Sequence, residues 1–229
     1  MNDENFKAVL ASSIAHDLRN PLSVVIAYSH LLSKSLEELS VDSRTIKQIE
    51  RIRRSAERVD QLIQNLVDLT QIEKGGLQLE RTVTDVKKIL SDSLEVLSAW
   101  SQEKNIVLKV SQADGPIQAV TDELRIRQIF TALVQNAIQY CRDGSRVNVS
   151  LAQTEEEVTL EVSDQGCGIA NERMASIFDL PQTKPGTLPI KQMSLYIARE
   201  AARAHGGDIE ATSRGEGKGS TFKVRFRKG

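Results

Sequence analysis

The chain has 229 residues, 40% of them hydrophobic and 27% charged, and its 30 basic and 31 acidic side chains give a formal net charge of −1. This length allows one large or two modest domains, and the balanced charge offers no field to attract nucleic acid or an anionic membrane surface. No apolar segment follows Met1 and no apolar run approaches the roughly 18 residues of a membrane span, so we expect neither a secretion signal nor a span within this chain.

The first third of the chain has the pattern of two long helices. Residues 4 to 73 contain one proline and no glycine, and apolar residues recur at intervals of three and four, which predicts a coiled-coil-like seam. "SVDS" at 40–43 offers a break and an N-cap, and the glycines of "EKGGLQ" at 73–78 end the second helix. A lone α-helical hairpin leaves its apolar stripes uncovered, so we expect two copies to form a dimeric four-helix bundle.

From residue 77 onward helices and strands alternate. Helical periodicity covers 86–104, 122–141 and 195–206, strand-like alternation covers 105–111, 116–120, 145–153 and 157–164, and 207–227 is typical of a strand hairpin. This order predicts an α/β sandwich of one mixed sheet and one helical layer, with Trp100 and Phe130 in its core. We therefore expect two domains, residues 1–76 and 77–229.

The stretch "AHDLRNPL" at 15–22 is unusual inside a helical pattern. At about 100° per residue, His16 falls nearly opposite the apolar side formed by Ile14 and Leu18, so it should face solvent. Asp17 is close enough to accept a hydrogen bond from the ring or to hold a water, and Pro21 lacks the amide hydrogen that would bond to the Asp17 carbonyl. A neutral imidazole oriented by an acid is a competent nucleophile.

The other histidines and the cysteines have simpler interpretations. We interpret His30 and His205 as ordinary surface histidines. Cys141 and Cys167 lie in dissimilar contexts, which argues against a disulfide and favours a reducing, cytoplasmic compartment. Cys167 is interpreted as a small buried hydrophobic residue, with a redox-active thiol as the alternative.

Several motifs together resemble one family. "SSIAHDLRNPLSVV" resembles the H-box of bacterial two-component sensor histidine kinases, and "DELRIRQIFTALVQNAIQY" is similar to the N-box helix. "DQGCGI" resembles the first glycine box and "IFDLP" the F-box, while "LYIAREAARAHGGDIEATS" and "GKGSTF" are similar to the segments that close the nucleotide-binding domain. These matches follow the family's order over nearly the whole chain. They imply a kinase core whose second domain has the histidine-kinase/Hsp90-type ATPase fold.

The resemblance implies the roles of the first domain. His16 would accept a phosphoryl group from ATP and pass it to an aspartate in the receiver domain of a response regulator. Asp17 matches the adjacent acid that orients the ring and takes its proton. Asn20 matches the position that places a water for hydrolysis of the phosphorylated regulator.

The resemblance also implies how the second domain binds ATP and Mg²⁺. Asn136 matches an asparagine that coordinates Mg²⁺, and an amide oxygen suits this hard cation. Asp164 matches the acid that accepts a hydrogen bond from the adenine amino group, and would reject guanine, which has a carbonyl there. Nucleotide binding is thereby assigned to Asn136, Tyr140, Asp164, Gly166, Gly168 and Thr221.

The sequence departs from the family at the phosphate end of this site. "IKQMSL" at 190–195 stands where a second glycine box is usual, so the glycines that let helix N-terminal amides wrap phosphates are missing. Ala132 and Gln139 replace an asparagine and a basic residue of the N-box, and Lys184 and Lys191 could supply the missing positive charge. We therefore expect modest nucleotide affinity and slow autophosphorylation.

Two alternatives follow from these departures. The first is a histidine phosphotransfer protein or pseudokinase scaffold that keeps His16 and does not turn over ATP. The second is a sensor that acts mainly as a phosphatase on the regulator through Asp17 and Asn20.

"RIRRSAER" at 51–58 is interpreted as a solvated bundle face, with docking of an acidic regulator as the alternative. "GEGKGS" at 215–220 is interpreted as the turn before the last strand and not as a Walker motif.

Overall fold

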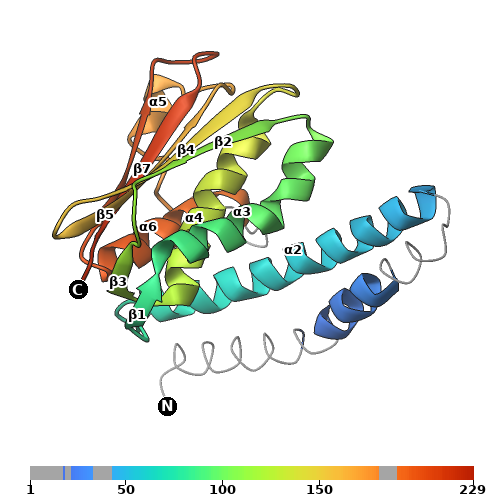
Figure 1. Ribbon diagram of the computed structural model, residues 1–229, viewed down its shortest axis with the longest axis horizontal. Coiled ribbons are helices and arrows are strands. Elements are labelled where there is room, and N and C mark those ends of the chain that lie inside the picture. The colour runs from blue at the N-terminus through green and yellow to red at the C-terminus, as the bar shows by residue number, and fades with distance from the viewer. Residues whose placement is uncertain (1–17, 19–21, 33–42, 181–189) are drawn as a thin grey trace. The chain divides into compact units, whose positions relative to one another are not determined.

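The computed structural model describes residues 18, 22–32, 43–180 and 190–229 (Figure 1). It divides the chain into two compact units, Met1–Gly75 and Gly76–Gly229. None of the helices in the described ranges is long and apolar enough to cross a membrane.

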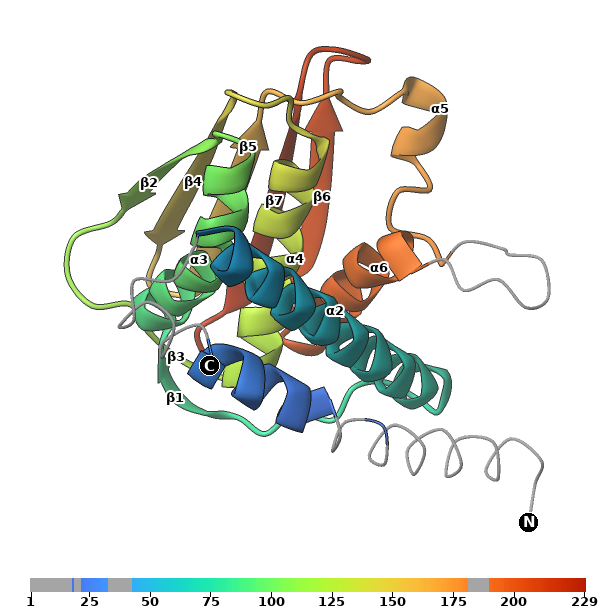
Figure 2. The ribbon, with the colours of Figure 1, turned by 90° about the vertical axis from the view of Figure 1, so that its right-hand side faces the viewer.

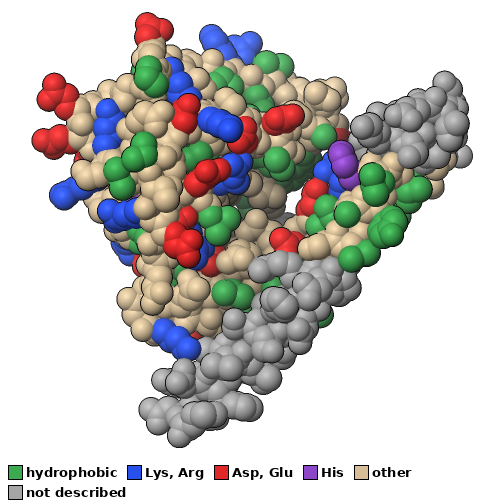
Figure 3. Space-filling view, turned by 60° about the horizontal axis from the view of Figure 1, so that its bottom comes forward, with side chains coloured by type: hydrophobic (Ala, Val, Ile, Leu, Met, Phe, Trp, Pro, Cys, Tyr) green, Lys and Arg blue, Asp and Glu red, His purple; other side chains and the backbone are tan. Residues whose placement is uncertain are grey.

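The first unit is helical where it is described. Residues 22–32 form a helix, and α2 spans Ser43–Glu73. Helix α2 ends where the sequence predicts, because Gly75 and Gly76 adopt φ angles of +123° and +118°, which a side chain would make unfavourable. Apolar side chains are exposed on this unit (Figure 3). Five of them belong to the apolar residues whose intervals of three and four predict the seam: Leu18, Val25, Leu32, Ile52 and Val59.

The second unit is built on a five-stranded sheet in the order β2-β4-β5-β7-β6. Its strands are β2 (Val107–Gln112), β4 (Arg146–Gln153), β5 (Glu157–Asp164), β6 (Asp208–Ser213) and β7 (Ser220–Arg227). Strands β2 and β4 are parallel and the other neighbours are antiparallel, so the mixed sheet is confirmed. A small sheet that the sequence did not predict pairs β1 (Thr82–Asp85) with β3 (Gln118–Thr121).

Three helices form one layer against this sheet (Figure 2): α3 (Val86–Glu103), α4 (Glu123–Tyr140) and α6 (Ile190–Ala204). Helix α6 begins five residues before the predicted start, and the short α5 (Asn171–Met174) was not predicted. Buried residues alternate along β5, as expected for a strand with one face on the core. Phe130 is fully buried and Trp100 packs half-buried against the same core, so both assignments are confirmed.

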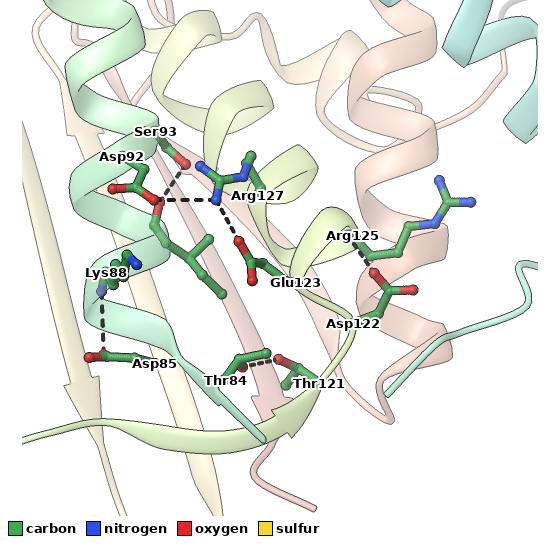
Figure 4. Close-up of polar contacts among 11 residues, drawn as sticks. Thr84, Asp85, Lys88, Asp92, Ser93, Thr121, Asp122, Glu123, Arg125 and Arg127 are labelled. Atoms are coloured by element: carbon green, nitrogen blue, oxygen red, sulfur yellow. Dashed lines mark hydrogen bonds and ion pairs between the residues drawn. The ribbon is translucent and has the colours of Figure 1, made fainter. Parts of the chain in front are cut away.

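Polar contacts fix the ends of these elements (Figure 4). The Asp85 carboxylate caps α3 by accepting hydrogen bonds from the amides of Lys87 and Lys88 at 3.1 and 3.3 Å. The hydroxyls of Thr84 and Thr121 are 2.6 Å apart in a buried contact that joins β1 to β3. Basic and acidic side chains lie interspersed over much of the face shown in Figure 3, as is usual for a solvated surface.

Candidate functional site

A cavity of about 790 Å³ opens in the second unit among α4, α5, α6, β7 and the loops after β5 and β6. Its apolar wall is formed by Ile169, Ile177, Leu180, Leu195 and Phe222. Its polar and charged wall includes Asn136, Tyr140, Cys167, Arg173, Asp179, Glu216 and Ser220. A cavity of this size, with an apolar wall and several convergent polar groups, is typical of a small-molecule site.

Asp164 ends β5 beside this cavity with both carboxylate oxygens engaged. Its Oδ1 accepts a hydrogen bond from the amide of Gly166 at 2.7 Å, and its Oδ2 accepts one from the hydroxyl of Ser220. The residue is 7% exposed. Asp164 is not itself a lining residue, but Ser220 is, so the carboxylate contacts the cavity wall through Ser220. Each carboxylate oxygen has a second lone pair for another donor.

Close backbone packing surrounds the carboxylate at three glycines. A Cβ on Gly166 would lie 2.5 Å from the carbonyl oxygen of Tyr140, and one on Gly219 would lie 2.1 Å from that of Asp164. Gly168 has a φ of +69°, and a Cβ there would lie 2.1 Å from the Gly215 carbonyl oxygen. These three positions therefore have no room for a side chain and require glycine. The backbone of the loop packs directly against the neighbouring carbonyl groups.

The hydroxyl of Ser213 joins the two loops that flank the site. It accepts hydrogen bonds from the amides of Ile169 at 3.1 Å and Gly215 at 3.2 Å, and donates to the carbonyl of Gly219 at 2.7 Å. A further backbone bond runs from the Gly217 amide to the Cys167 carbonyl at 2.6 Å. The "GEGKGS" segment thus forms the turn before β7, as predicted, and supports the glycine loop.

The end of α4 is held by a lysine that sequence reasoning missed. The Lys104 ammonium donates to the carbonyls of Ile138, Gln139 and Cys141 at 2.8, 3.1 and 2.8 Å. The carbonyl of Tyr140 instead accepts from the amide of Cys167 at 3.1 Å. The last carbonyls of this helix are therefore satisfied, and a positive charge complements its C-terminal dipole. This fixes the helix that brings Asn136 and Tyr140 to the cavity.

Asn136 suits a magnesium ligand in chemistry and position. Its side chain lies on the cavity wall and makes no hydrogen bond within the described part of the chain. The described ranges contain no cluster of three or more acidic, histidine or cysteine side chains that would form a complete metal site. A magnesium ion held here would take Asn136 as a protein ligand and complete its shell with phosphate and water oxygens.

A cluster of aromatic and charged groups fixes the F-box. Phe178 packs edge-on against Phe222 with ring centroids 6.1 Å apart, and the Arg199 guanidinium lies 5.0 Å from the Phe178 ring. Arg199 also binds Asp208 through two hydrogen bonds of 2.8 and 3.1 Å. Burial, the largest single influence, favours the neutral acid. The hydrogen bonds from Arg199 and the Ile209 amide, together with the charges of Arg199 and Arg203, outweigh it and lower the pKa of Asp208. The cluster ties the segment before residue 181 to α6 and β6.

Two predictions about isolated residues are wrong. Cys167 is exposed and lines the cavity, because the close packing at Gly166 and Gly168 turns its side chain outward. His205 is 2% exposed, because β7 and the start of α4 cover the end of α6. His30 is exposed, as predicted.

We expect Cys167 to react with iodoacetamide at least about tenfold faster than Cys141. Cys141 is buried, and burial raises the pKa of its thiol. Bound adenine nucleotide should slow modification of Cys167, because the thiol lies in the cavity wall. Mass spectrometry of the two cysteine peptides measures both rates, and Cys167→Ser serves as the control that retains only the slow reaction. Equal rates for the two thiols would contradict the exposure of Cys167, and no effect of nucleotide would contradict nucleotide binding next to Cys167.

The structure brings some of the predicted site residues together. Asn136, Tyr140 and Gly168 line the cavity, and Asp164 and Gly166 lie directly behind its wall. The Thr221 hydroxyl is outside the wall and donates to Ser163 at 2.9 Å. His16, Asp17, Asn20 and Lys184 lie outside the described residues, as does the side chain of Lys191. "IKQMSL" forms the first turns of α6.

Two protein-family models match the chain. The His Kinase A phospho-acceptor domain matches residues 6–75, and the histidine kinase-, DNA gyrase B- and HSP90-like ATPase domain matches residues 121–229. Among curated proteins the chain is 30% identical to sensor protein KdpD of Clostridium acetobutylicum, over 98% of this chain and 25% of that protein. It is 32% identical to the aerobic respiration control sensor protein ArcB of Escherichia coli, over 95% of this chain and 28% of that protein.

Solved structures share the fold. Full-length ShkA in complex with AMPPNP aligns with a TM-score of 0.67 at 21% identity, over 96% of this chain and 46% of that one. The histidine kinase AdeS of Acinetobacter baumannii aligns with a TM-score of 0.61 at 21% identity, over 93% of this chain and 98% of that one.

The second unit is therefore an ATPase domain of the type shared by histidine kinases, DNA gyrase B and HSP90. With the phospho-acceptor domain that precedes it, the chain belongs to the sensor histidine kinase family. The predicted fold, a helical phospho-acceptor domain followed by an α/β sandwich, is confirmed. The chain spans about a quarter of the length of the curated relatives it matches.

Proposed function

We propose that this chain is the catalytic core of a sensor histidine kinase that transfers the γ-phosphoryl group of ATP to His16. The observation that carries the proposal is the buried Asp164 carboxylate, held by Gly166 and Ser220 directly behind the wall of an open cavity in an ATPase fold. The domain boundary that we propose, after residue 76, lies next to the division between the two units.

Asp164 selects the base in this proposal. An acceptor that is fixed in place recognises the adenine amino group, and a guanine carbonyl would meet the same negative charge. The apolar wall formed by residues such as Ile169 and Leu195 suits a planar base. Asn136 would hold a magnesium ion, whose charge neutralises the triphosphate.

His16 would attack in line. A bond forms between a ring nitrogen and the γ-phosphorus while the bond to the β–γ bridging oxygen breaks, so ADP leaves and Asp17 takes the ring proton. The phosphoryl group then passes to a receiver-domain aspartate of a response regulator. Two copies would associate through the exposed apolar seam of the first unit, and the reaction would take place in the cytoplasm.

Arg173 is proposed to bind the phosphates in place of the missing second glycine box. It supplies the one cationic side chain among the described residues of the cavity wall. We expect Arg173→Ala to weaken Mg-ATP binding about three- to tenfold, a modest effect because the side chain is exposed. Adenosine affinity should not change, since it has no phosphate. Calorimetry with both ligands tests this, with Arg142→Ala as an exposed control outside the cavity wall. A parallel loss of adenosine affinity would exclude a phosphate-binding role.

Labelling with γ-³²P ATP tests the proposed function. The wild-type chain should acquire an acid-labile label that is absent from His16→Gln, because phosphorylated histidine hydrolyses in acid. His30→Gln is the matched control, since it changes an exposed histidine of the same unit and should keep the label. A label that persists in His16→Gln would disprove the assignment.

The same experiment separates the alternatives. Absence of label from ATP, with label accepted from a phosphorylated regulator, would favour the phosphotransfer protein or pseudokinase scaffold. The altered "IKQMSL" segment is the feature that supports this alternative. If Asn20→Ala abolished dephosphorylation of the regulator and left labelling of His16 intact, phosphatase activity through Asp17 and Asn20 would be supported.

A further inference from the structure

The segment that leads from α2 into the second unit is fastened at two helix ends. The amide of Glu80 donates to Oδ2 of Asp122, the N-cap residue of α4, at 2.9 Å. The Arg81 guanidinium donates to the carbonyl of Ala204, the last residue of α6, at 2.8 Å. The first segment of the second unit is thus tied to α4 and α6, and both helices also contribute residues to the cavity wall.

A buried histidine completes this contact. Nε2 of His205 lies 3.1 Å from the amide nitrogen of Asp122, and Nδ1 lies 2.8 Å from the carbonyl oxygen of Ala201. An amide can only donate and a carbonyl can only accept, so Nε2 carries no proton and Nδ1 carries one. The geometry therefore requires the neutral imidazole in a single tautomer. The Asp122 side chain meanwhile caps α4 through Oδ1 and the amide of Arg125 at 3.1 Å (Figure 4).

Protonation of His205 would break this arrangement. A proton on Nε2 would face the Asp122 N–H, so an attractive contact would become repulsive. The charged side chains that act on the ring are Arg81 from residues 77–81 and Asp122 and Arg125 from the start of α4. From β7, the backbone amide of Arg227 donates to the His205 carbonyl at 3.4 Å. The Phe226 ring packs against the imidazole with centroids 6.3 Å apart. The Asp122 carboxylate is already engaged by the Glu80 and Arg125 amides.

Burial is the main cause that lowers the pKa of His205, and the charges of Arg81 and Arg125 lower it further. The hydrogen bond to Ala201 and the charge of Asp122 act in the opposite direction and do not cancel this effect. The unfolded chain therefore binds this proton more readily than the folded chain does. Stability rises with pH wherever the unfolded state holds more protons, so the contribution of His205 is present above about pH 6.5 and is lost as the pH falls towards the folded-state pKa.

We propose that His205 is a pH-sensitive latch for residues 77–81, the first segment of the second unit. In the neutral form the imidazole holds the Asp122 amide, and Asp122 holds the Glu80 amide. In the protonated form Asp122 shifts, and residues 77–81 detach from the ends of α4 and α6 while the sheet stays folded. The latch depends on contacts within the second unit, so it stands whether or not the chain phosphorylates His16.

Hydrogen exchange at the Glu80 amide tests the latch in the full chain. After correction for intrinsic exchange, its protection should fall at least about tenfold between about pH 7.5 and about pH 4.5. The amides of β5 should keep their protection over the same range. His205→Gln keeps an acceptor but does not titrate, so the pH dependence should disappear, whereas His30→Gln should behave as wild type. Constant protection of Glu80 in the wild type, an unchanged pH response in His205→Gln, or equal loss across β5 would overturn the proposal.

A second measurement keeps the test valid if His205→Gln fails to fold. The ring resonances of His205 in the wild-type protein should titrate with the same midpoint as the loss of Glu80 protection, and that midpoint should lie below about 6.5. Midpoints that differ, or a ring that titrates at or above the ordinary histidine value, would rule out the latch.

Discussion

Replacing Asp164 with asparagine is expected to weaken ATP binding by about 10- to 100-fold while leaving the fold intact. The carboxylate accepts from Gly166 at 2.7 Å and from Ser220, and in our proposal from the adenine amino group as well. An amide keeps one acceptor oxygen and replaces the other with a donor, so it cannot make all three bonds. A lost hydrogen bond to a charged group weakens binding by about 1.5–3 kcal/mol, which gives this range.

The design of this measurement separates recognition from folding. Calorimetry gives the ATP affinity, and thermal unfolding without nucleotide shows whether the domain is intact. Asp143→Asn, at an exposed position in the turn after α4, is the matched control and should bind ATP as the wild type does. Discrimination against GTP should also shrink in Asp164→Asn, because an amide N–H can donate to the guanine carbonyl. Unchanged ATP affinity would show that the base lies elsewhere and would remove the main support for the proposed site.

The sequence predicted the site best where local pattern determines geometry. The alternation along β5 fixes which residues face the core, and "DQGCGI" directly after it places Asp164 at the strand end with glycines beside it. The sequence analysis assigned Thr221 to the site, whereas the residue that lines the cavity is its neighbour Ser220. Ser163 pairs with Thr221 in the β5–β7 register, so the next pair brings Ser220 opposite Asp164. A shift of one residue moves a side chain to the other face of a sheet, so Ser220 and not Thr221 reaches the cavity.

Contacts between residues far apart in the chain were out of reach of the sequence. The ring of His205 is buried by a contact with Asp122, 83 positions earlier in the chain. The spacing of apolar residues along α6 does not predict this contact. Cys167 is exposed because its neighbour Gly166 packs on the carbonyl of Tyr140, which lies 26 positions earlier in the chain (166 − 140). Local periodicity finds elements and faces, but the partner of a polar side chain is set by how the elements assemble.

Replacing Lys104 with methionine is expected to lower the free energy of unfolding of the second unit by about 2–4 kcal/mol. Three carbonyls at the end of α4 accept from its ammonium, at 2.8, 3.1 and 2.8 Å, and methionine fills similar space without a donor. These groups would lose both a hydrogen-bond partner and the charge that complements the helix dipole. The loss is smaller than the sum of three bonds because water can reach part of this half-buried site.

Urea unfolding followed by the fluorescence of Trp100, the single tryptophan, measures the effect because this residue packs on the core of the same unit. Lys109→Met, at an exposed position of β2, is the matched control and should change stability little. Since the Tyr140 carbonyl also binds the Cys167 amide, fraying of α4 should disturb the glycine loop and weaken ATP binding in the Lys104 variant as well. Equal stabilities of the two variants would mean that water replaces the Lys104 ammonium as hydrogen-bond donor to the three carbonyls without loss of stability. Reduced stability with unchanged ATP affinity would show that the end of α4 does not position the nucleotide site.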